Sequence, residues 1–298
     1  MPPTPVVTEH ILINNHRIAY GIHSPPTSTS TTTPTPIILI HGTPSSSLIW
    51  RHIIPPLTTT GYKVHVYDLL SYGLSERPWD PKTDTSISGQ VPILLSLLDH
   101  WSITSAHIIA HDIGGGIAQR FCILHPDKIN ILSLTLIDTV SFNSYPSERT
   151  KAQMQEGLET LIQAPNGTHR EHFKEWILST VTDTGKMRME EEGSLDAYLE
   201  YISNPVGQAS FFQHQVKHYD SRHTMEVAGR IGELGRVPVM IVWGREDRWQ
   251  VLQWGENLKR CIPGAELSVI DGGGHFVMED RPEVVGEVVR GFLGRVDR

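Results

Sequence analysis

The chain has 298 residues, of which 39% are hydrophobic, and a formal net charge of -8 at pH 7. This length can form one large domain, with or without an insertion. The negative charge and the lack of any cluster rich in Lys and Arg argue against nucleic acid or an anionic membrane as the main partner.

The two cysteines and the N-terminal residues bear on localisation. Cys122 and Cys261 lie far apart and lack the spacing of metal ligands, which predicts free thiols in a reducing compartment. The first ten residues lack the basic and apolar segments of a secretory signal, and no run of about 18 apolar residues predicts a membrane span. We therefore expect a cytoplasmic protein without a metal. The sequence leaves its oligomeric state open.

The first half of the chain alternates between strand-like and helix-like segments. Residues 6–13 and 16–22 are predicted to be strands joined by an Asn-Asn turn, and the Pro- and Thr-rich residues 24–36 are predicted to form a loop. Short apolar runs then predict strands that are buried on both faces, at residues 37–40, 64–68, 106–110 and 132–138. Helices are predicted at residues 90–100 and 115–125. This alternation is typical of a mostly parallel sheet covered by helices.

The alternation stops near residue 139 and resumes after residue 226. The intervening residues read as several helices, which predicts a helical insertion within an α/β core. Further segments are then predicted, namely a strand at 237–244, a helix at 251–260, a strand at 265–270 and a helix at 282–293. We expect a core formed by residues 1–138 and 227–298, with residues 139–226 inserted between its two parts.

A strand, a glycine-rich turn and a helix are predicted at residues 110–121 (AHDIGGGIAQRF). A turn of this kind usually presents a serine nucleophile in the pattern G-x-S-x-G, but here the presented residue is Asp112. An aspartate that only caps the helix is the alternative. Asp247 and His275 also follow predicted strands, where ligands of open α/β sheets bind. The order Asp112, Asp247, His275 is the order of nucleophile, acid and histidine in α/β-hydrolases.

Five stretches together carry a resemblance to a known family. They are HGTPSSSLIWR (41–51), DLLSYGLSERP (68–78), AHDIGGGIAQRF (110–121), WGRED (243–247) and GGGHFVMEDRPE (272–283). The chain resembles the α/β-hydrolase fold family, and more narrowly its branch of epoxide hydrolases and haloalkane dehalogenases. That resemblance implies an α/β-hydrolase core, a helical cap at residues 139–226, an aspartate nucleophile and no cofactor.

The nucleophile indicates the reaction class. A carboxylate that attacks a saturated carbon forms a stable alkyl ester, which favours an epoxide or a carbon–halogen bond as the target. His275 would then activate the water that hydrolyses the ester, and Asp247 would orient His275, with Asp138 as the alternative acid. The backbone N–H groups of Thr43 and Ile113 are the expected oxyanion donors.

The groups that stabilise the leaving atom are harder to predict. Dehalogenases that resemble this chain carry Trp after the nucleophile and often Asn after His-Gly, where this chain has Ile113 and Thr43. Related epoxide hydrolases carry a cap Trp-Tyr-Arg segment, where this chain has Phe211, Phe212 and Gln213. Substitutes for these groups include Tyr145, Tyr198, Tyr201, Tyr219, Trp176 and Gln208. Predicted pocket residues are His41, Trp50, His111, Tyr145, Trp176, Phe212 and Phe276, with structural hydrogen bonding favoured for His41 and His111.

We therefore predict a hydrolase that acts on a small molecule. Hydrolysis of an epoxide is favoured, because a strained ring can open with weaker acid assistance, whereas a departing halide lacks both of the N–H donors that those dehalogenases supply. Haloalkane hydrolysis is the second hypothesis. The third is a lyase, isomerase or cyclase of a specialised biosynthetic pathway, and the fourth is a ligand-binding protein without activity.

Overall fold

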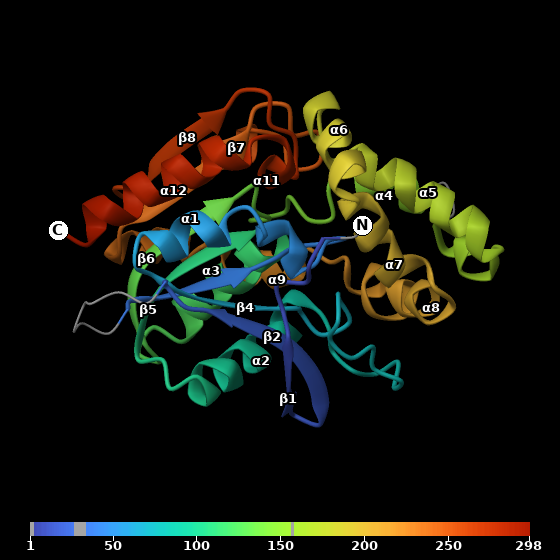
Figure 1. The fold of residues 1–298 in the computed structure, drawn as a ribbon, viewed down its shortest axis with the longest axis horizontal. Coiled ribbons are helices and arrows are strands. Elements are labelled where there is room, and N and C mark those ends of the chain that lie inside the picture. Colours follow the sequence, from blue (N-terminus) through green and yellow to red (C-terminus); the bar gives the residue numbers. More distant parts are fainter. Residues whose placement is uncertain (1–2, 27–33, 156–157) are drawn as a thin grey trace.

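The computed structural model describes residues 3–26, 34–155 and 158–298, so most of the predicted Pro- and Thr-rich loop lies outside the described residues. Within them, eight strands form one sheet in the order β1-β2-β4-β3-β5-β6-β7-β8 (Figure 1). The strands are β1 (Glu9–Ile13), β2 (His16–His23), β3 (Pro36–Ile40), β4 (Lys63–Tyr67), β5 (Ser105–His111), β6 (Asn130–Ile137), β7 (Val239–Gly244) and β8 (Glu266–Ile270).

The sheet is antiparallel only at the edge that holds β1 and β2. β1 pairs antiparallel with β2 and β2 with β4, whereas all pairs from β4 to β8 are parallel. Residues 37–40 of β3 are fully buried, as expected for a central strand covered on both faces. The predicted mostly parallel sheet flanked by helices is confirmed.

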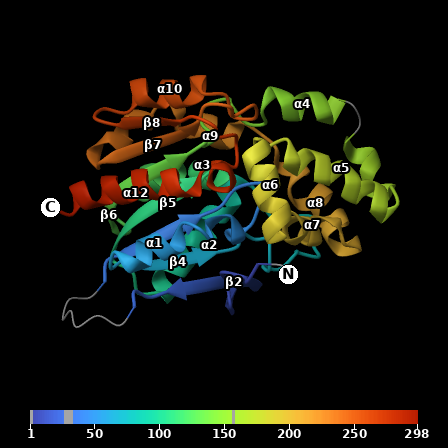
Figure 2. The same cartoon turned by 45° about the horizontal axis from the view of Figure 1, so that its top comes forward.

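Helices cover both faces of the sheet. They are α1 (Ile54–Thr59), α2 (Ile87–His100), α3 (Ile113–Leu124), α9 (Arg222–Ala228), α10 (Gln253–Cys261), α11 (Val277–Asp280) and α12 (Pro282–Val296), with 3₁₀ turns at η1 (Ser47–Trp50) and η4 (Ile231–Arg236). α1 and α12 contact each other on one face (Figure 2). On the other face α3 contacts α2, α9 and η4, and η4 contacts α10.

The remaining helices lie together beyond one end of the sheet (Figures 1 and 2). They are α4 (Glu148–Gln155), α5 (Asn166–Leu178), α6 (Asp183–Glu192), α7 (Ser194–Ser203) and α8 (Pro205–His214), with short turns at η2 (Leu158–Gln163) and η3 (Val216–His218). Buried aromatic side chains hold this helical part together. The ring centroids of Phe173 and Phe211 lie 4.6 Å apart, and those of Phe173 and Trp176 lie 5.0 Å apart. We call α4 to α8 with their connections the helical part below.

The helical part starts soon after β6, and α9 already packs on the core helices α2 and α3. No helix among the described residues is long and apolar enough to cross a membrane.

Candidate active site

Asp112 occupies a strained turn between β5 and α3. Its backbone has φ +50° and ψ -122°, a conformation that costs a non-glycine residue on the order of 1–3 kcal/mol. Its N–H donates to the carbonyl of Ile137 at the end of β6 (3.2 Å). Its side chain makes no capping hydrogen bond to α3, so the structure gives no support to the alternative capping role. The turn directs the carboxylate away from the helix, toward the loop after β3.

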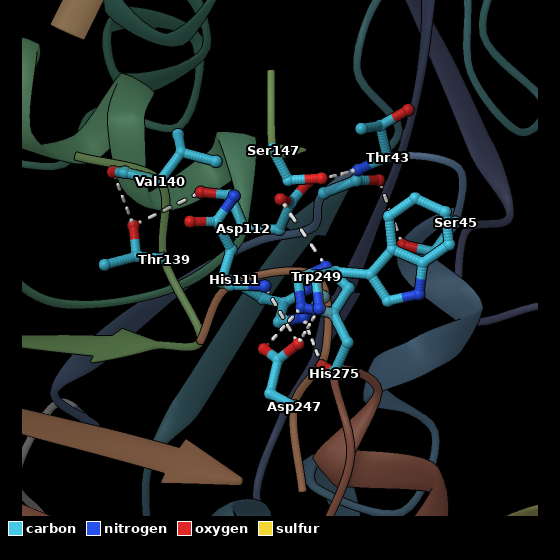
Figure 3. Close-up of polar contacts among 12 residues, drawn as sticks. Thr43, Ser45, His111, Asp112, Thr139, Val140, Ser147, Asp247, Trp249 and His275 are labelled. Atoms are coloured by element: carbon cyan, nitrogen blue, oxygen red, sulfur yellow. Dashed lines mark hydrogen bonds and ion pairs between the residues drawn. The ribbon is translucent and has the colours of Figure 1, made fainter. Parts of the chain in front are cut away.

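Three predicted residues meet at the carboxyl ends of the strands (Figure 3). Nε2 of His275 lies 3.5 Å from Oδ2 of Asp112, and Nδ1 of His275 lies 2.8 Å from Oδ2 of Asp247. The other oxygen of Asp247 accepts hydrogen bonds from the N–H groups of Trp249 (2.7 Å) and Gln250 (2.9 Å). All three side chains are buried, so their mutual attraction acts in a low-dielectric environment. The arrangement can hold a nucleophile, a base and the acid that orients the base.

The charges of this cluster determine the protonation of its members. Burial opposes a charge on His275, but Asp247 and Asp112 raise its pKa well above the usual value. Burial likewise opposes the charge of Asp112, yet the hydrogen bond with His275 and the proximity of its ring lower the pKa of that carboxyl. The resting site therefore holds an ionised Asp112 beside a protonated His275.

The loop after β3 brings a backbone N–H group to the carboxylate of Asp112. The Thr43 N–H donates to Oδ1 of Asp112 (2.8 Å), as expected from the sequence. The approach is close, because a Cβ on Gly42 would lie 2.5 Å from the same oxygen. Among the described residues, no hydrogen bond joins the Ile113 N–H to this carboxylate, so its role as the second donor stays a prediction.

Asp138 lies at the end of β6 and is fully buried. Its Oδ1 accepts a hydrogen bond from the Gly244 N–H (2.8 Å), and its Oδ2 has no partner among the described residues. Burial and the nearby Asp247 raise the pKa of Asp138 well above its usual value. Nδ1 of His275 donates its hydrogen bond to Asp247 and not to Asp138, so the geometry favours Asp247 as the orienting acid.

A narrow cavity with a volume of about 30 Å³ opens onto Asp112 and His275. Its other lining residues are Thr43, Pro44, Tyr145, Ser147, Thr150, Trp176, Thr180, Tyr219, Trp249 and Gln250. They come from both the core and the helical part. The rings of Trp176 and Trp249 stack with centroids 5.5 Å apart and planes at 19°.

Two predicted pocket residues, Tyr145 and Trp176, line this cavity, and so does Tyr219. Trp249 and Gln250 were missed, although both lie within three residues of Asp247 in the loop after β7. The other substitutes proposed for the leaving group point elsewhere. The Tyr198 hydroxyl donates to Oε1 of Glu279 (2.6 Å), Gln208 donates to the carbonyl of Leu161 (2.7 Å), and Tyr201 lies outside the cavity lining.

The other five predicted pocket residues lie outside this lining. They are His41, Trp50, His111, Phe212 and Phe276. The rings of Trp50 and Phe276 are fully buried, and Phe212 packs against Phe211 with centroids 5.5 Å apart. These three apolar rings are buried and contribute to packing.

The two flanking histidines make structural hydrogen bonds. Nδ1 of His41 donates to the carbonyl of Gly42 (2.9 Å), and its Nε2 accepts from the Leu69 N–H (3.0 Å). Nε2 of His111 donates to the carbonyl of His275 (2.9 Å). Burial and the adjacent His275 lower the pKa of His111 to about 3, so this ring stays neutral. Within the described part of the chain, no group of three or more His, Cys, Asp or Glu could hold a metal ion.

Comparison with known proteins agrees with this arrangement at the level of the family. Residues 35–282 match the alpha/beta hydrolase fold family. The chain belongs to this family. A solved alpha/beta hydrolase fold protein from Burkholderia ambifaria superposes with a TM-score of 0.80 and 30% identity, over 94% of this chain and 96% of that one.

Two curated relatives extend the comparison. A 2-hydroxy-6-oxononadienedioate/2-hydroxy-6-oxononatrienedioate hydrolase from Cupriavidus pinatubonensis is 24% identical, over 87% of this chain and 86% of its own. A cis-3-alkyl-4-alkyloxetan-2-one decarboxylase from Xanthomonas campestris is 26% identical, over 87% and 88%. These relatives support a hydrolase of the family. They do not carry the names of the narrower epoxide hydrolase and dehalogenase branch, which stays a prediction.

Proposed function

We propose that this α/β-hydrolase opens a small epoxide through a covalent alkyl ester on Asp112. The observation that carries the proposal is that two tyrosines of the segment between β6 and β7, Tyr145 and Tyr219, line the same narrow cavity as Asp112. Their ring centroids lie 5.3 Å apart. The Tyr219 hydroxyl lies 3.5 Å from Oγ1 of Thr43, whose N–H binds Asp112.

Two phenols beside a carboxylate suit the first chemical step. An oxygen of Asp112 attacks a ring carbon, the C–O bond of the epoxide breaks, and the departing oxygen takes a proton from a phenol. Burial, the neighbouring tyrosines and the charge of Asp112 raise the pKa of Tyr145 well above its usual value, and burial also raises that of Tyr219. Both phenols therefore remain protonated donors at neutral pH.

Alkylation prepares the second step. The ester carries no charge, so one of the two anions that raise the pKa of His275 disappears. The imidazole can then give up its proton, which restores the phenol that was deprotonated in the first step. Neutral His275 next acts as a general base on a water that attacks the carbonyl carbon of the Asp112 ester. The Thr43 N–H faces the oxygen on which negative charge develops. Breakdown of the tetrahedral intermediate releases a diol and restores Asp112.

The test uses the His275→Ala variant, which lacks the base. We expect incubation with short-chain epoxides to add the mass of one epoxide to the intact protein, and peptide mapping to place it on Asp112. Matched haloalkanes of equal chain length are the comparison, and an Asp112→Asn variant is the control that cannot form the ester. An adduct from haloalkanes alone would shift the function to dehalogenation. The absence of any adduct, with an inert wild-type protein, would contradict both.

The geometry gives less support to halide release. Nε1 of Trp249 donates to the carbonyl of Ser179 (3.3 Å), so this indole N–H is already engaged. Trp176 is the other indole in the lining.

A second candidate function comes from one relative. The oxetan-2-one decarboxylase is named for a strained four-membered cyclic ester and matches 87% of this chain. The same carboxylate could open such a ring. The protein would then act as a lyase, which is the third hypothesis of the sequence analysis. Release of carbon dioxide and an alkene from an oxetan-2-one, without diol formation from epoxides, would favour it over the epoxide hydrolase.

A further inference from the structure

The loop that carries His275 is fastened to the helical part of the molecule by one buried carboxylate. We propose that Asp280 is a positioning residue: it makes the alignment of His275 depend on the docking of residues 180–185, and it thereby supports ester hydrolysis but not ester formation. The assignment of these two steps rests on the proposed function.

Asp280, in α11, accepts four hydrogen bonds. Its Oδ2 binds the N–H of Gly274, the residue before His275, at 2.7 Å. Its Oδ1 binds the N–H (2.9 Å) and the hydroxyl (2.8 Å) of Thr182 and the N–H of Gly185 (3.0 Å), at the start of α6. The side chain is buried, so these bonds are shielded from competing water. One carboxylate thus joins the backbone beside His275 to the first turn of α6.

The same segment contacts the residue after His275. The Phe276 N–H donates to the carbonyl of Thr180 at 3.0 Å. The space is tight, because a Cβ on Gly274 would lie 2.6 Å from that carbonyl oxygen. The backbone on both sides of His275 is therefore held by residues 180–185, either directly or through Asp280.

The backbone turn that carries Asp112 does not depend on the docking of residues 180–185. Its turn is fixed within the core, by the bond from its N–H to Ile137 and the bond from the Thr43 N–H to its carboxylate. Loosening of residues 180–185 would displace the base and leave the nucleophile in place. Because a displacement of about 1 Å can slow a catalysed step roughly 100-fold, the two half-reactions should respond differently.

Glu279 provides a matched control on the same helix. It is also fully buried and also binds the helical part, through the Tyr198 hydroxyl (2.6 Å). It further pairs with Arg51 (2.6 Å), which binds Glu192 at the end of α6. No side-chain hydrogen bond described for Glu279 reaches residues 272–276, and its backbone N–H, which donates to the Phe276 carbonyl (2.8 Å), is kept when the side chain is replaced. Its loss therefore weakens the contact between core and helical part without releasing the backbone beside His275.

The experiment compares Asp280→Asn, Thr182→Val, Thr182→Ser and Glu279→Gln with the wild type. Ester formation and hydrolysis are timed separately by rapid quenching and intact mass. For Asp280→Asn we expect hydrolysis to slow roughly 10- to 100-fold, with formation within about twofold, so that the Asp112 ester accumulates. Thr182→Val should show a smaller effect of the same kind, and Thr182→Ser should restore hydrolysis. Equal slowing of both steps, or equal accumulation in Glu279→Gln, would overturn the proposal.

A second readout needs no substrate. Amide hydrogen exchange of the peptide 272–277 should accelerate in Asp280→Asn and Thr182→Val, and should remain at the wild-type rate in Thr182→Ser and Glu279→Gln. If no epoxide alkylates Asp112, the proposed function fails, but this exchange pattern still supports the positioning role. Unchanged exchange in both Asp280→Asn and Thr182→Val would reject that role whatever the substrate.

Discussion

Nε2 of His275 lies 3.5 Å from Oδ2 of Asp112, with both side chains buried. In the resting site this is a contact between a cation and an anion, which raises the pKa of His275 and lowers that of Asp112. In the proposed ester it becomes a contact between an imidazole and a neutral group. The same pair of residues would thus carry different charges in the two half-reactions.

This relationship predicts that the rate of ester hydrolysis falls at low pH, whereas the rate of ester formation does not fall over the same range. As the pH falls through the pKa of His275 in the ester, the base becomes protonated and hydrolysis slows. Ester formation persists to lower pH, because the lowered pKa of Asp112 keeps the nucleophile ionised. Quenched-flow mass measurements across pH should show the ester accumulating as the pH is lowered. An ester level that does not change with pH would contradict the proposed role of His275.

Oxygen labelling distinguishes attack by Asp112 from direct attack by water. In a single turnover in ¹⁸O-water, with enzyme in excess, the diol should contain only unlabelled oxygen, because its new oxygen comes from the carboxylate. The label should enter Asp112 and appear in product only on later turnovers. Mass spectra of the product and of the Asp112 peptide provide the measurement. Labelled diol in the first turnover would exclude the covalent route.

Removal of the two phenols should separate epoxide opening from halide release. Tyr145→Phe and Tyr219→Phe should each lower kcat/KM for epoxides roughly 10- to 100-fold, because a proton donor to the departing oxygen is lost. Haloalkane turnover, where present, should change by less than about threefold, because a halide needs no proton. Tyr201→Phe is the control, since this phenol lies outside the cavity lining. Equal losses in all three variants would argue against a specific donor role.

The two acids near His275 should differ in importance. Asp247→Asn should slow ester hydrolysis on the order of 10³-fold, because the hydrogen bond that holds the imidazole loses its charged acceptor. Asp138→Asn should cost less than about tenfold, because its carboxylate binds the Gly244 N–H and not the imidazole. Rates of hydrolysis of the trapped ester give the comparison. The reverse order would make Asp138 the orienting acid.

The residues at strand ends were predictable because each follows a short apolar run. The shared location of Asp112, Asp247 and His275 follows from the order of the strands and from the rule that the carboxyl ends of parallel strands meet at one edge of the sheet. The Thr43 N–H followed from its place after β3, since Pro44 has no N–H to donate. Local sequence thus carries the part of the site that the sheet itself positions.

The lining from the helical part was less predictable, because it depends on packing between helices. Tyr145 and Tyr219 flank this part, one before α4 and one after α8, and their rings lie side by side although more than 70 residues separate them. Phe212 was proposed for the pocket from its place in a family segment, but its ring packs among the helices. Helix limits also differ from the prediction. The helix expected at residues 90–100 begins at Ile87 as α2, because the Ser86 hydroxyl caps it by accepting a hydrogen bond from the Gly89 N–H.

The stacked indoles of Trp176 and Trp249 come from different parts of the molecule, one from α5 and one from the loop after β7. A movement of the helical part away from the core would therefore pull the two rings apart. Indole emission is sensitive to stacking and to water, so the unlabelled protein carries an optical reporter of its own opening. Stopped-flow fluorescence could therefore time entry and product release, and Trp176→Phe would assign the signal to this pair.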